Sequence, residues 1–575
     1  MSLKNRLPCL QWPRLSLSLL RGETLAGLSV GLMVIPQGVA YAALAGMPLI
    51  TGIYAALLPA LVAALFGGSP RLSVGPTALT CLLVTASLAG MAPPGSADWV
   101  TLAVWLALLS GLLQVVLGLA RFGWVLNLVN APVLSAFTQA AAVLIIASQV
   151  RELLGWRNGD DGPALHPASL AFGLGTLALL WFTRRWTSKL PLLLLAVVVA
   201  SAGLSLWTGF ADGGGTVVGA LPSGWPALYI PHWLPLDTLG HLVVPALVIT
   251  LVSYLETAAS ARIDHSREGR LWDRDQDLIA QGLAKLASAL SGAFPTSSSF
   301  SRSALNLYAG ARSGWATLAS VAVVGLALLW FLPVLHHVPK AVLAAIVVVA
   351  VIGLIRPREF WRLWQVSRVE AVIAGSTFLI TLLTAPRLYW GVIAGVLMAL
   401  SHFLFGRLHP RIVEVGRHPD GRLRDRHLWQ LPVLAPDTFA LRMDAELDFA
   451  SASALERAIT THLNSHPGTQ RVVLLAQPIN RIDATGVETF GRLRQQLAGR
   501  RVVLYVVGLK LPVELALRAA GELTEAPYLK VLVTEAELMR VLADMATAED
   551  TAPNPTDHAG HDDGASTPKE APATS

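Results

Sequence analysis

Long apolar runs follow one another through the first 405 residues, and they limit the fold more than any other feature of the sequence. Each run approaches the roughly 20 residues that an α-helix needs to cross the hydrocarbon core of a bilayer. Apolar residues make up 54% of the chain and charged residues only 14%, which lies outside the usual composition of a soluble domain. We therefore expect an all-α polytopic membrane domain over residues 22–406.

About fourteen such spans are predicted. They lie near residues 23–44, 48–67, 75–90, 101–119, 130–150, 166–183, 190–208, 239–261, 276–293, 299–311, 314–333, 341–355, 369–384 and 388–405. The third and the tenth are too short to cross a bilayer alone. Broken backbone at membrane depth is tolerated only where it faces protein or a water-filled cavity. We therefore expect these two short spans to face the interior rather than lipid.

Each short span begins in a hydroxyl-rich segment. These segments are residues 73–80 and 295–303. Each lies about fifty residues into one apolar half of the chain. Half-helices at corresponding places in two repeats are the best sequence indication of a substrate site in a transporter. The free N–H groups and the dipole at the start of a helix favour an anion. The pair of segments predicts an anion carrier.

The distribution of Lys and Arg predicts the topology. Basic residues gather in the connections 184–189, 262–274 and 356–368, whereas the long connection 208–239 has none. By the positive-inside rule, the basic connections are cytoplasmic and the long one is outside. An even number of spans places both termini in the cytoplasm, including a basic leader over residues 1–21. The net charge of +6 follows from this topology, so no nucleic-acid partner is predicted.

The polarity rises after residue 406 and the pattern becomes that of a soluble α/β domain. We predict a linker over residues 407–430, the α/β domain over 431–546 and a disordered tail over 547–575, which is rich in Ala, Pro, Asp and Thr. The domain has three predicted strands near 438–443, 471–476 and 501–507, and helices near 452–463, 486–497, 513–520 and 535–545. Two histidines in the tail, His558 and His561, do not make a metal site, and no metal or cofactor is predicted.

Glu256 is the only acid or base between residues 242 and 261, within the eighth predicted span. An ionised carboxylate at mid-membrane costs about 2.5–3.5 kcal/mol on insertion scales, so such a residue usually has a function. Burial favours the neutral carboxyl, which predicts that Glu256 binds and releases a proton or pairs with Na⁺. The alternative is structural: a carboxylate near the cytoplasmic end of its helix that reaches water or pairs with Arg262.

Arg302 opens the tenth span, where a cation is unfavourable at the positive end of a helix dipole unless an anion lies nearby. A bound substrate would supply that anion. Local capping or a pair with Glu256 is the alternative. In the first span, Gln37 and Tyr41 are four residues apart and share one helix face, where they line a cavity or join helices.

No enzymatic constellation is present in the sequence. The chain lacks the G-x-x-x-x-G-K-[ST] pattern of ATP-driven transport, and it has no Ser/His/Asp or metal-ligand arrangement. A secondary carrier or channel is therefore predicted rather than a pump or an enzyme.

Ordered motifs in both halves resemble the sulfate permease (SulP) family. In the first half they are PQGVAYAALAGMP (36–48), GIY (52–54), GGSP (67–70) and VGPTA (74–78). In the second half they are LETA (255–258), DQDLIAQG (275–282), GAFP (292–295) and FSRSALN (300–306). The resemblance covers residues 21–542. It implies two inverted repeats of seven segments, near 22–208 and 239–406, divided into core and gate domains and assembled as a homodimer.

The same resemblance implies a site between the facing amino ends of the third and tenth segments. The residues at the matching positions are Gln37, Tyr41, Thr77, Ala78, Phe300, Ser301 and Arg302 for the substrate. Glu256 matches the acidic position associated with coupling to a cation or proton. Ser260 matches a hydroxyl near the ion of Na⁺-coupled members.

The C-terminal domain resembles the sulfate-transporter and anti-sigma-antagonist (STAS) fold through RIDATG (481–486). Soluble members carry a phosphorylated serine after this Asp, whereas this chain has Ala484, so that switch is absent. We expect a cytoplasmic regulatory domain without catalysis of its own, which binds a cytoplasmic partner.

Proton-coupled uptake of sulfate through a bacterial inner membrane is the leading hypothesis. The alternatives are Na⁺-coupled bicarbonate transport, proton-coupled dicarboxylate transport, and an uncoupled anion exchanger or channel. A hypothesis from another class is a membrane platform that presents the STAS domain to partners.

Overall fold

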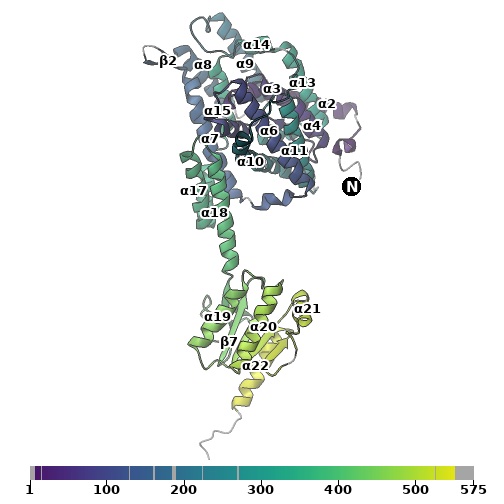
Figure 1. The fold of residues 1–575 in the computed structure, drawn as a ribbon, viewed down its shortest axis with the longest axis vertical. Helices are drawn as coiled ribbons and strands as arrows, with labels where there is room; N and C mark the ends of the chain where they lie inside the picture. Colours follow the sequence, from purple (N-terminus) through teal and green to yellow (C-terminus); the bar gives the residue numbers. More distant parts are fainter. Residues whose placement is uncertain are drawn as a thin grey trace, which may run out of the picture. The chain divides into compact units, whose positions relative to one another are not determined.

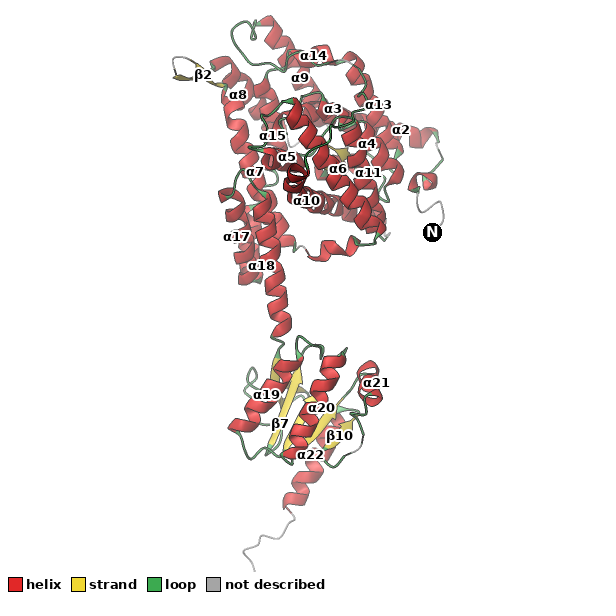
Figure 2. Ribbon diagram, in the orientation of Figure 1, coloured by secondary structure: helices red, strands yellow, loops and turns green. Residues whose placement is uncertain are grey.

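The computed structural model describes residues 7–14, 16–128, 130–159, 162–183, 190–222, 224–268, 271–524 and 526–550. The chain divides into two compact units, residues 1–400 and 401–575. The first unit is built almost entirely of helices, whereas the second has a sheet covered by helices (Figures 1 and 2). The predominantly helical apolar unit followed by an α/β domain confirms the predicted fold class.

The described helices of the first apolar half begin near the predicted spans. They are α2 (Leu17–Leu44), α3 (Thr51–Tyr54), α4 (Leu58–Phe66), α5 (Ala78–Leu88), α6 (Ala97–Leu119), α7 (Ala131–Leu154), α8 (Pro167–Thr183) and α9 (Leu190–Trp207), with short 3-10 turns η1 (Pro8–Gln11) and η2 (Gly123–Leu128) and a hairpin of β2 (Trp156–Gly159) and β3 (Gly162–Leu165). Helix α2 begins within the predicted leader because Ser16 caps it, accepting a hydrogen bond from Leu19 N at 3.3 Å.

The second apolar half has a similar series. Its described helices are α10 (Leu236–Glu268), α11 (Arg274–Leu290), α12 (Phe300–Tyr308), α13 (Trp315–Trp330), α14 (Leu332–His336), α15 (Lys340–Ile352), α16 (Pro357–Val366), α17 (Arg368–Leu383) and α18 (Tyr389–Leu408). Within the described residues, six helices are long and apolar enough to cross a membrane, judged by length and composition alone. The number of crossing segments therefore stays a prediction.

Small residues bring helices α6 and α11 into close contact. A Cβ on Gly282 would lie 2.6 Å from the carbonyl oxygen of Gly111, and a Cβ on Gly111 would lie 2.9 Å from that of Gly282. Only glycine permits this approach at both positions, which is a common way to pack helices where no hydrophobic effect drives them together. The backbones of α6 and α11 therefore meet at these two glycines.

The two hydroxyl-rich segments, residues 73–80 and 295–303, pair with each other through short strands. Strand β1 (Val74–Gly75) runs antiparallel to β4 (Ser297–Ser298), with Val74 opposite Ser298 and Gly75 opposite Ser297. Helix α5 follows β1 and helix α12 follows β4, so the two helices leave from opposite ends of the strand pair. Their amino ends therefore face each other across it. All four strand residues are buried, as expected for broken backbone inside a membrane unit.

The second unit has a six-stranded sheet in the order β10-β9-β8-β7-β5-β6. The strands are β5 (Ile412–Arg417), β6 (Leu423–Asp425), β7 (Thr438–Met443), β8 (Arg471–Leu475), β9 (Val503–Val507) and β10 (Leu529–Leu532). Strands β7 to β10 are parallel, and β5 joins β7 and β6 antiparallel. Alternate residues of the strands pack on opposite faces, against α19 (Ala452–Ser465), α20 (Ala484–Gly499) and α21 (Leu511–Ala519) on one and α22 (Glu535–Asp550) on the other.

Two predicted boundaries differ from the structure. Residues 407–430 are not a plain linker, because α18 continues to Leu408 and strands β5 and β6 then extend the sheet. Strand β6 has only three residues, whereas β5 has six and buries Val413 and Val415, an apolar pattern that the prediction of a linker missed. Helix α22 continues to Asp550, four residues into the predicted tail, and the rest of that tail, with His558 and His561, lies outside the described residues.

Candidate anion site

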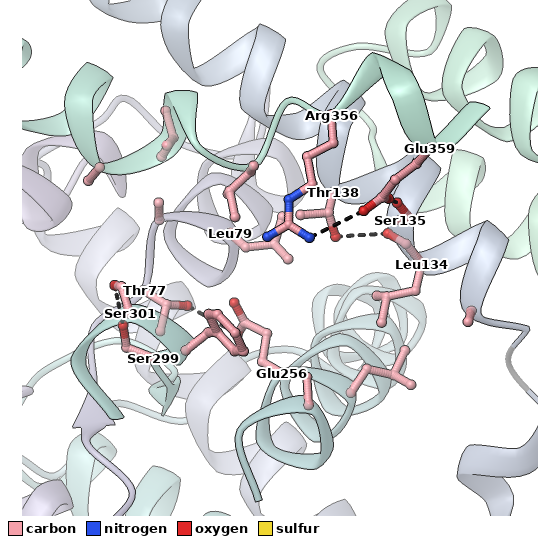
Figure 3. Close-up of a pocket in the computed structure, with 18 of the residues that line it drawn as sticks. Thr77, Leu79, Leu134, Ser135, Thr138, Glu256, Ser299, Ser301, Arg356 and Glu359 are labelled. Carbon is pink, nitrogen blue, oxygen red and sulfur yellow. Dashed lines mark hydrogen bonds and ion pairs between the residues drawn. The ribbon is translucent and has the colours of Figure 1, made fainter. Parts of the chain in front are cut away.

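A cavity of about 350 Å³ lies at the amino ends of α5 and α12 (Figure 3). It is lined by residues from seven helices, with α2, α5, α10 and α12 on one side and α7, α15 and α16 on the other. The lining residues are Tyr41, Thr77, Ala78, Leu79, Ala131, Leu134, Ser135, Thr138, Leu255, Glu256, Ala259, Ser299, Phe300, Ser301, Ala350, Val351, Leu354, Arg356 and Glu359. Most of this lining is apolar, so the few polar groups determine what the cavity binds.

Each half-helix has a hydroxyl cap at the cavity. Thr77 Oγ1 accepts a hydrogen bond from Thr80 N at 3.4 Å, and Ser299 Oγ accepts one from Arg302 N at 3.5 Å. The N–H groups of the first helical turn have no partner within their own helix, and they carry the positive end of the dipole. Two such ends at one cavity make a strong site for an anion.

Glu256 points into the same cavity from α10 (Figure 3). Its Oε2 accepts hydrogen bonds from Thr77 Oγ1 at 3.2 Å and from Thr80 Oγ1 at 3.5 Å. No cation of the described residues lies within 4 Å of this carboxylate, so neither Arg262 nor Arg302 pairs with it. Of the two structural alternatives for Glu256, the ion pair with Arg262 is absent from the described residues, and the partly exposed side chain faces the cavity.

Arg302 occupies a different place from the one predicted. It does not line the cavity; its side chain is buried, and it donates from Nε to Ser73 Oγ at 3.2 Å and from Nη1 to the Pro76 carbonyl at 2.9 Å. Its Nη2 has no hydrogen-bond partner among the described residues. The strand pair causes this arrangement, because it sets Ser73 and Pro76 beside the first turn of α12.

The other predicted residues fall into two groups. Six line the cavity together: Tyr41, Thr77, Ala78, Glu256, Phe300 and Ser301. Gln37 is buried one turn before Tyr41 on α2 and does not line the cavity. Ser260 also lies outside the lining, and its Oγ donates to the backbone carbonyl of Glu256 at 3.0 Å instead of facing the carboxylate.

The opposite wall carries an ion pair that sequence reasoning did not place in the site. Arg356 Nη1 donates to Glu359 Oε1 at 3.2 Å, and Ser135 donates to the other carboxylate oxygen (Figure 3). Gln139 Oε1 fixes the backbone by accepting from Arg356 N at 2.8 Å. In the sequence Arg356 indicated only a cytoplasmic connection. The three-residue spacing to Glu359 at a helix start was the available sign of an ion pair.

Two family models match this chain, one in each of its two units. Residues 20–377 match the sulfate permease family, and residues 433–532 match the STAS domain. A chloroplastic sulfate transporter 4.1 of Arabidopsis thaliana is 30% identical over 89% of this chain and 79% of its own length. A probable sulfate transporter of Mycobacterium tuberculosis is 31% identical over 87% of this chain and 91% of its own.

Solved structures show the same fold. The murine solute carrier 26 family member A9 anion transporter, in its inward-facing state, aligns with a TM-score of 0.84 over 94% of each chain at 20% identity. The transmembrane domain of the cyanobacterial bicarbonate transporter BicA aligns with a TM-score of 0.57, over 66% of this chain and 98% of that one, at 21% identity.

Proposed function

Because the chain belongs to the sulfate permease family, we propose that it is a secondary active transporter that takes up sulfate together with a proton. The observation that carries this proposal is one cavity that combines two helix amino ends with the carboxylate of Glu256, whereas the other lining carboxylate, Glu359, is paired with Arg356. The helix ends attract an anion, whereas an ionised carboxylate in the same cavity repels it. The site therefore binds the anion best when Glu256 is protonated.

The size of the repulsion is sufficient for coupling. Two unit charges about 4 Å apart interact by about 4 kcal/mol at an effective dielectric constant near 20, and a dianion doubles that energy. Protonation of Glu256 removes this cost. By linkage, the bound anion favours the protonated carboxyl by the same amount, so sulfate and proton bind together. Glu256 becomes ionised again when the sulfate and the proton have left the site.

Transport also requires alternate exposure of the site to the two sides of the membrane. We assign α2, α5, α10 and α12 to a core that carries the anion, and α7, α15 and α16 to a gate, since these two groups of helices form opposite walls of the cavity. The two inverted repeats, the homodimer, the inner-membrane location with cytoplasmic termini and a regulatory role of the STAS domain belong to the same proposal.

Coupling of anion uptake to sodium is a second candidate function, and one observation supports it. Two hydroxyls and a carboxylate oxygen meet at Thr77, Thr80 and Glu256. An all-oxygen group of this kind suits a hard cation such as Na⁺. In that case the anion would be moved by a sodium gradient, as the bicarbonate alternative requires.

Uptake into proteoliposomes separates these functions. Labelled sulfate, bicarbonate and fumarate are offered to the purified chain under an inward proton gradient, an inward Na⁺ gradient or no gradient, with protein-free liposomes as control. We expect sulfate to accumulate only with the proton gradient. Accumulation driven by Na⁺ would replace the proton assignment with the sodium one, and flux of equal size without any gradient would indicate an exchanger or channel.

The platform hypothesis has its own test in cells that depend on this chain for a measurable phenotype. Deletion of the residues after Leu431 and the substitution Arg302→Ala are compared in the same strain. A transporter requires Arg302 for the phenotype, because this side chain supports the half-helices of the site. A phenotype that survives Arg302→Ala and is lost with the deletion would favour the platform.

A further inference from the structure

Lys285 is a fully buried cation in α11 that the proposed mechanism does not yet use. Its Nζ donates to Gln114 Oε1 and to Ser253 Oγ, each at 2.7 Å. No carboxylate of the described residues lies within 4 Å of this ammonium. A buried charge without a counter-ion in contact is costly, so an anion bound nearby would stabilise this ammonium.

Three helices hold the ammonium in place. Gln114 of α6 donates from Nε2 to the Thr250 carbonyl at 3.1 Å and to Ser253 Oγ at 2.9 Å, which turns its amide oxygen toward Lys285. Gln114 and Ser253 are themselves fully buried. The close α6–α11 contact at Gly111 and Gly282 lies one turn from Lys285. This is a fixed position, not that of a lysine reaching toward water.

The ammonium lies next to the anion site. Ser253 precedes Glu256 by three residues on α10, so the two side chains are neighbours one turn apart. On the other side, Ser297 of β4 donates from Oγ to the Ser253 carbonyl at 3.3 Å. Lys285 thus supports the β4 side of the strand pair, as Arg302 supports the β1 side through Ser73 and Pro76.

The charges around the strand pair can be counted. Among the elements packed against α11, α4 has no ionisable side chain and α6 has only Asp98 in its first turn. Helix α10 carries Glu256 and Tyr254 within a turn of Ser253, and its other ionisable residues are more than two turns away along the helix. Helix α12, which packs against α10, brings Arg302. The ionisable residues of α11 itself are Arg274, Asp275 and Asp277, two turns or more from Lys285. With Glu256 protonated, Lys285 and Arg302 leave two positive charges at the site, which matches a dianion.

We propose that Lys285 is a specificity-determining residue whose charge makes the site prefer divalent over monovalent anions. This inference rests on the proposed transport function. A unit charge attracts a dianion twice as strongly as a monoanion at the same distance, so its removal weakens sulfate binding more than nitrate binding. Lys285 acts through the field at the strand pair and not by direct contact, because it does not line the cavity.

The test compares the full chain with two variants. Lys285→Gln keeps hydrogen-bond donors toward Gln114 and Ser253 but removes the charge, whereas Lys285→Arg keeps the charge. Lys530→Met, which neutralises an exposed lysine of the second unit, is the matched control. For each protein, the unfolding midpoint is measured against increasing sulfate or nitrate, and labelled sulfate uptake is measured in proteoliposomes.

We expect Lys285→Gln to raise the half-saturating sulfate concentration by about tenfold or more while nitrate changes by about threefold or less. Lys285→Arg and Lys530→Met should keep the wild-type ratio. An equal change for both anions in Lys285→Gln, with Lys285→Arg equally impaired, would show that Lys285 only joins helices and would overturn the inference. Wild-type protein that neither binds nor transports sulfate would instead overturn the proposed function.

Discussion

At the scale of single residues, Thr77 joins the two parts of the proposed mechanism, the anion site and the coupling carboxylate. Thr77 caps α5 with its Oγ1, and the same atom donates to Glu256. A change in the protonation of Glu256 therefore reaches the amino end of the half-helix directly. In the proposed mechanism, this geometry links the carboxylate to the helix dipole that would hold the anion.

Thr77→Val tests this shared role. Valine has nearly the same shape but lacks the hydroxyl, so the variant loses the helix cap, worth about 1 kcal/mol, and a hydrogen bond to Glu256. We expect the apparent KM for sulfate to rise about fivefold or more in proteoliposome uptake. Thr77→Ser keeps the hydroxyl and should stay near wild type. Equal kinetics for the valine and serine variants would argue against the shared role.

Asp483 has a comparable position in the STAS domain. Its carboxylate accepts from Gly486 N at 2.8 Å and from Phe449 N at 3.0 Å, so it caps α20 and holds the loop before α19. The backbone N–H of Gly486, followed by that of Phe449, lowers the pKa of this carboxyl. The stabilisation is therefore complete above the ordinary Asp pKa of about 3.9, and it is lost as the pH falls toward the lower folded value.

Asp483→Ala should cost about 1 kcal/mol at neutral pH, because it removes the cap. In the full chain, amide hydrogen exchange over residues 484–490 should become about fivefold faster, with little change in α22 on the other face of the sheet. Asp483→Asn keeps an acceptor and should show a smaller effect. Unchanged exchange in the alanine variant would mean that the cap does not stabilise α20.

At the scale of elements, the pairing of β1 with β4 explains why the two half-helices face each other. Two residues from each strand suffice, because additional hydrogen bonds run from Ser299 N to the Ser73 carbonyl and from Ser73 N to Ser303 Oγ, each at 2.9 Å. Arg302 adds two donors to the β1 side. The strand pair is thus the scaffold of the candidate anion site.

Arg302→Lys tests the scaffold. Lysine retains the charge but lacks the planar fork that reaches Ser73 Oγ and the Pro76 carbonyl together. We expect a loss of about 1.5–3 kcal/mol and reduced sulfate uptake, since hydrogen bonds from a charged group are replaced incompletely. The readouts are the unfolding midpoint in detergent and the initial rate of uptake. A lysine variant with wild-type stability and rate would show that only the charge matters.

The α6–α11 contact gives a sharper element-scale prediction. Gly282→Ala would place a Cβ 2.6 Å from the Gly111 carbonyl, so the helices must separate, at a cost of about 1–3 kcal/mol. Gly375→Ala in α17 is the matched control, because nothing lies within 4 Å of its new Cβ. We expect a lower unfolding midpoint for Gly282→Ala and an unchanged or raised one for Gly375→Ala. Equal midpoints for the two variants would contradict the close contact.

At the scale of the whole molecule, the sequence predicted the large features well. The apolar spans predicted a helical membrane unit, alternation predicted β7, and short apolar runs predicted β8 and β9, because burial leaves a strong apolar pattern in both units. The two short segments predicted at 73–80 and 295–303 meet at one cavity, and their role as a substrate site stays a prediction. Six of the nine predicted site residues line the cavity.

The missed features depend on long-range geometry. A strand of two residues has no period to detect, so the β1–β4 pair could not be predicted. The burial of the Arg302 side chain against Ser73 and Pro76 depends on that pair, so it could not be predicted either. The ion pair of Arg356 and Glu359 enters the site only through the path of α16 across the unit. Lys285 escaped notice because a single lysine among small residues has no pattern; only its contacts with Gln114 and Ser253 identify it.

The central claim is that one proton, held by Glu256, moves with each anion. The most direct measurement records the internal pH of proteoliposomes with an entrapped dye after sulfate is added outside. Wild-type protein should acidify the interior in proportion to sulfate uptake, faster at acidic external pH. Glu256→Gln should still exchange labelled sulfate between the two sides but produce no acidification. Acidification by Glu256→Gln equal to that of the wild type would contradict the claim.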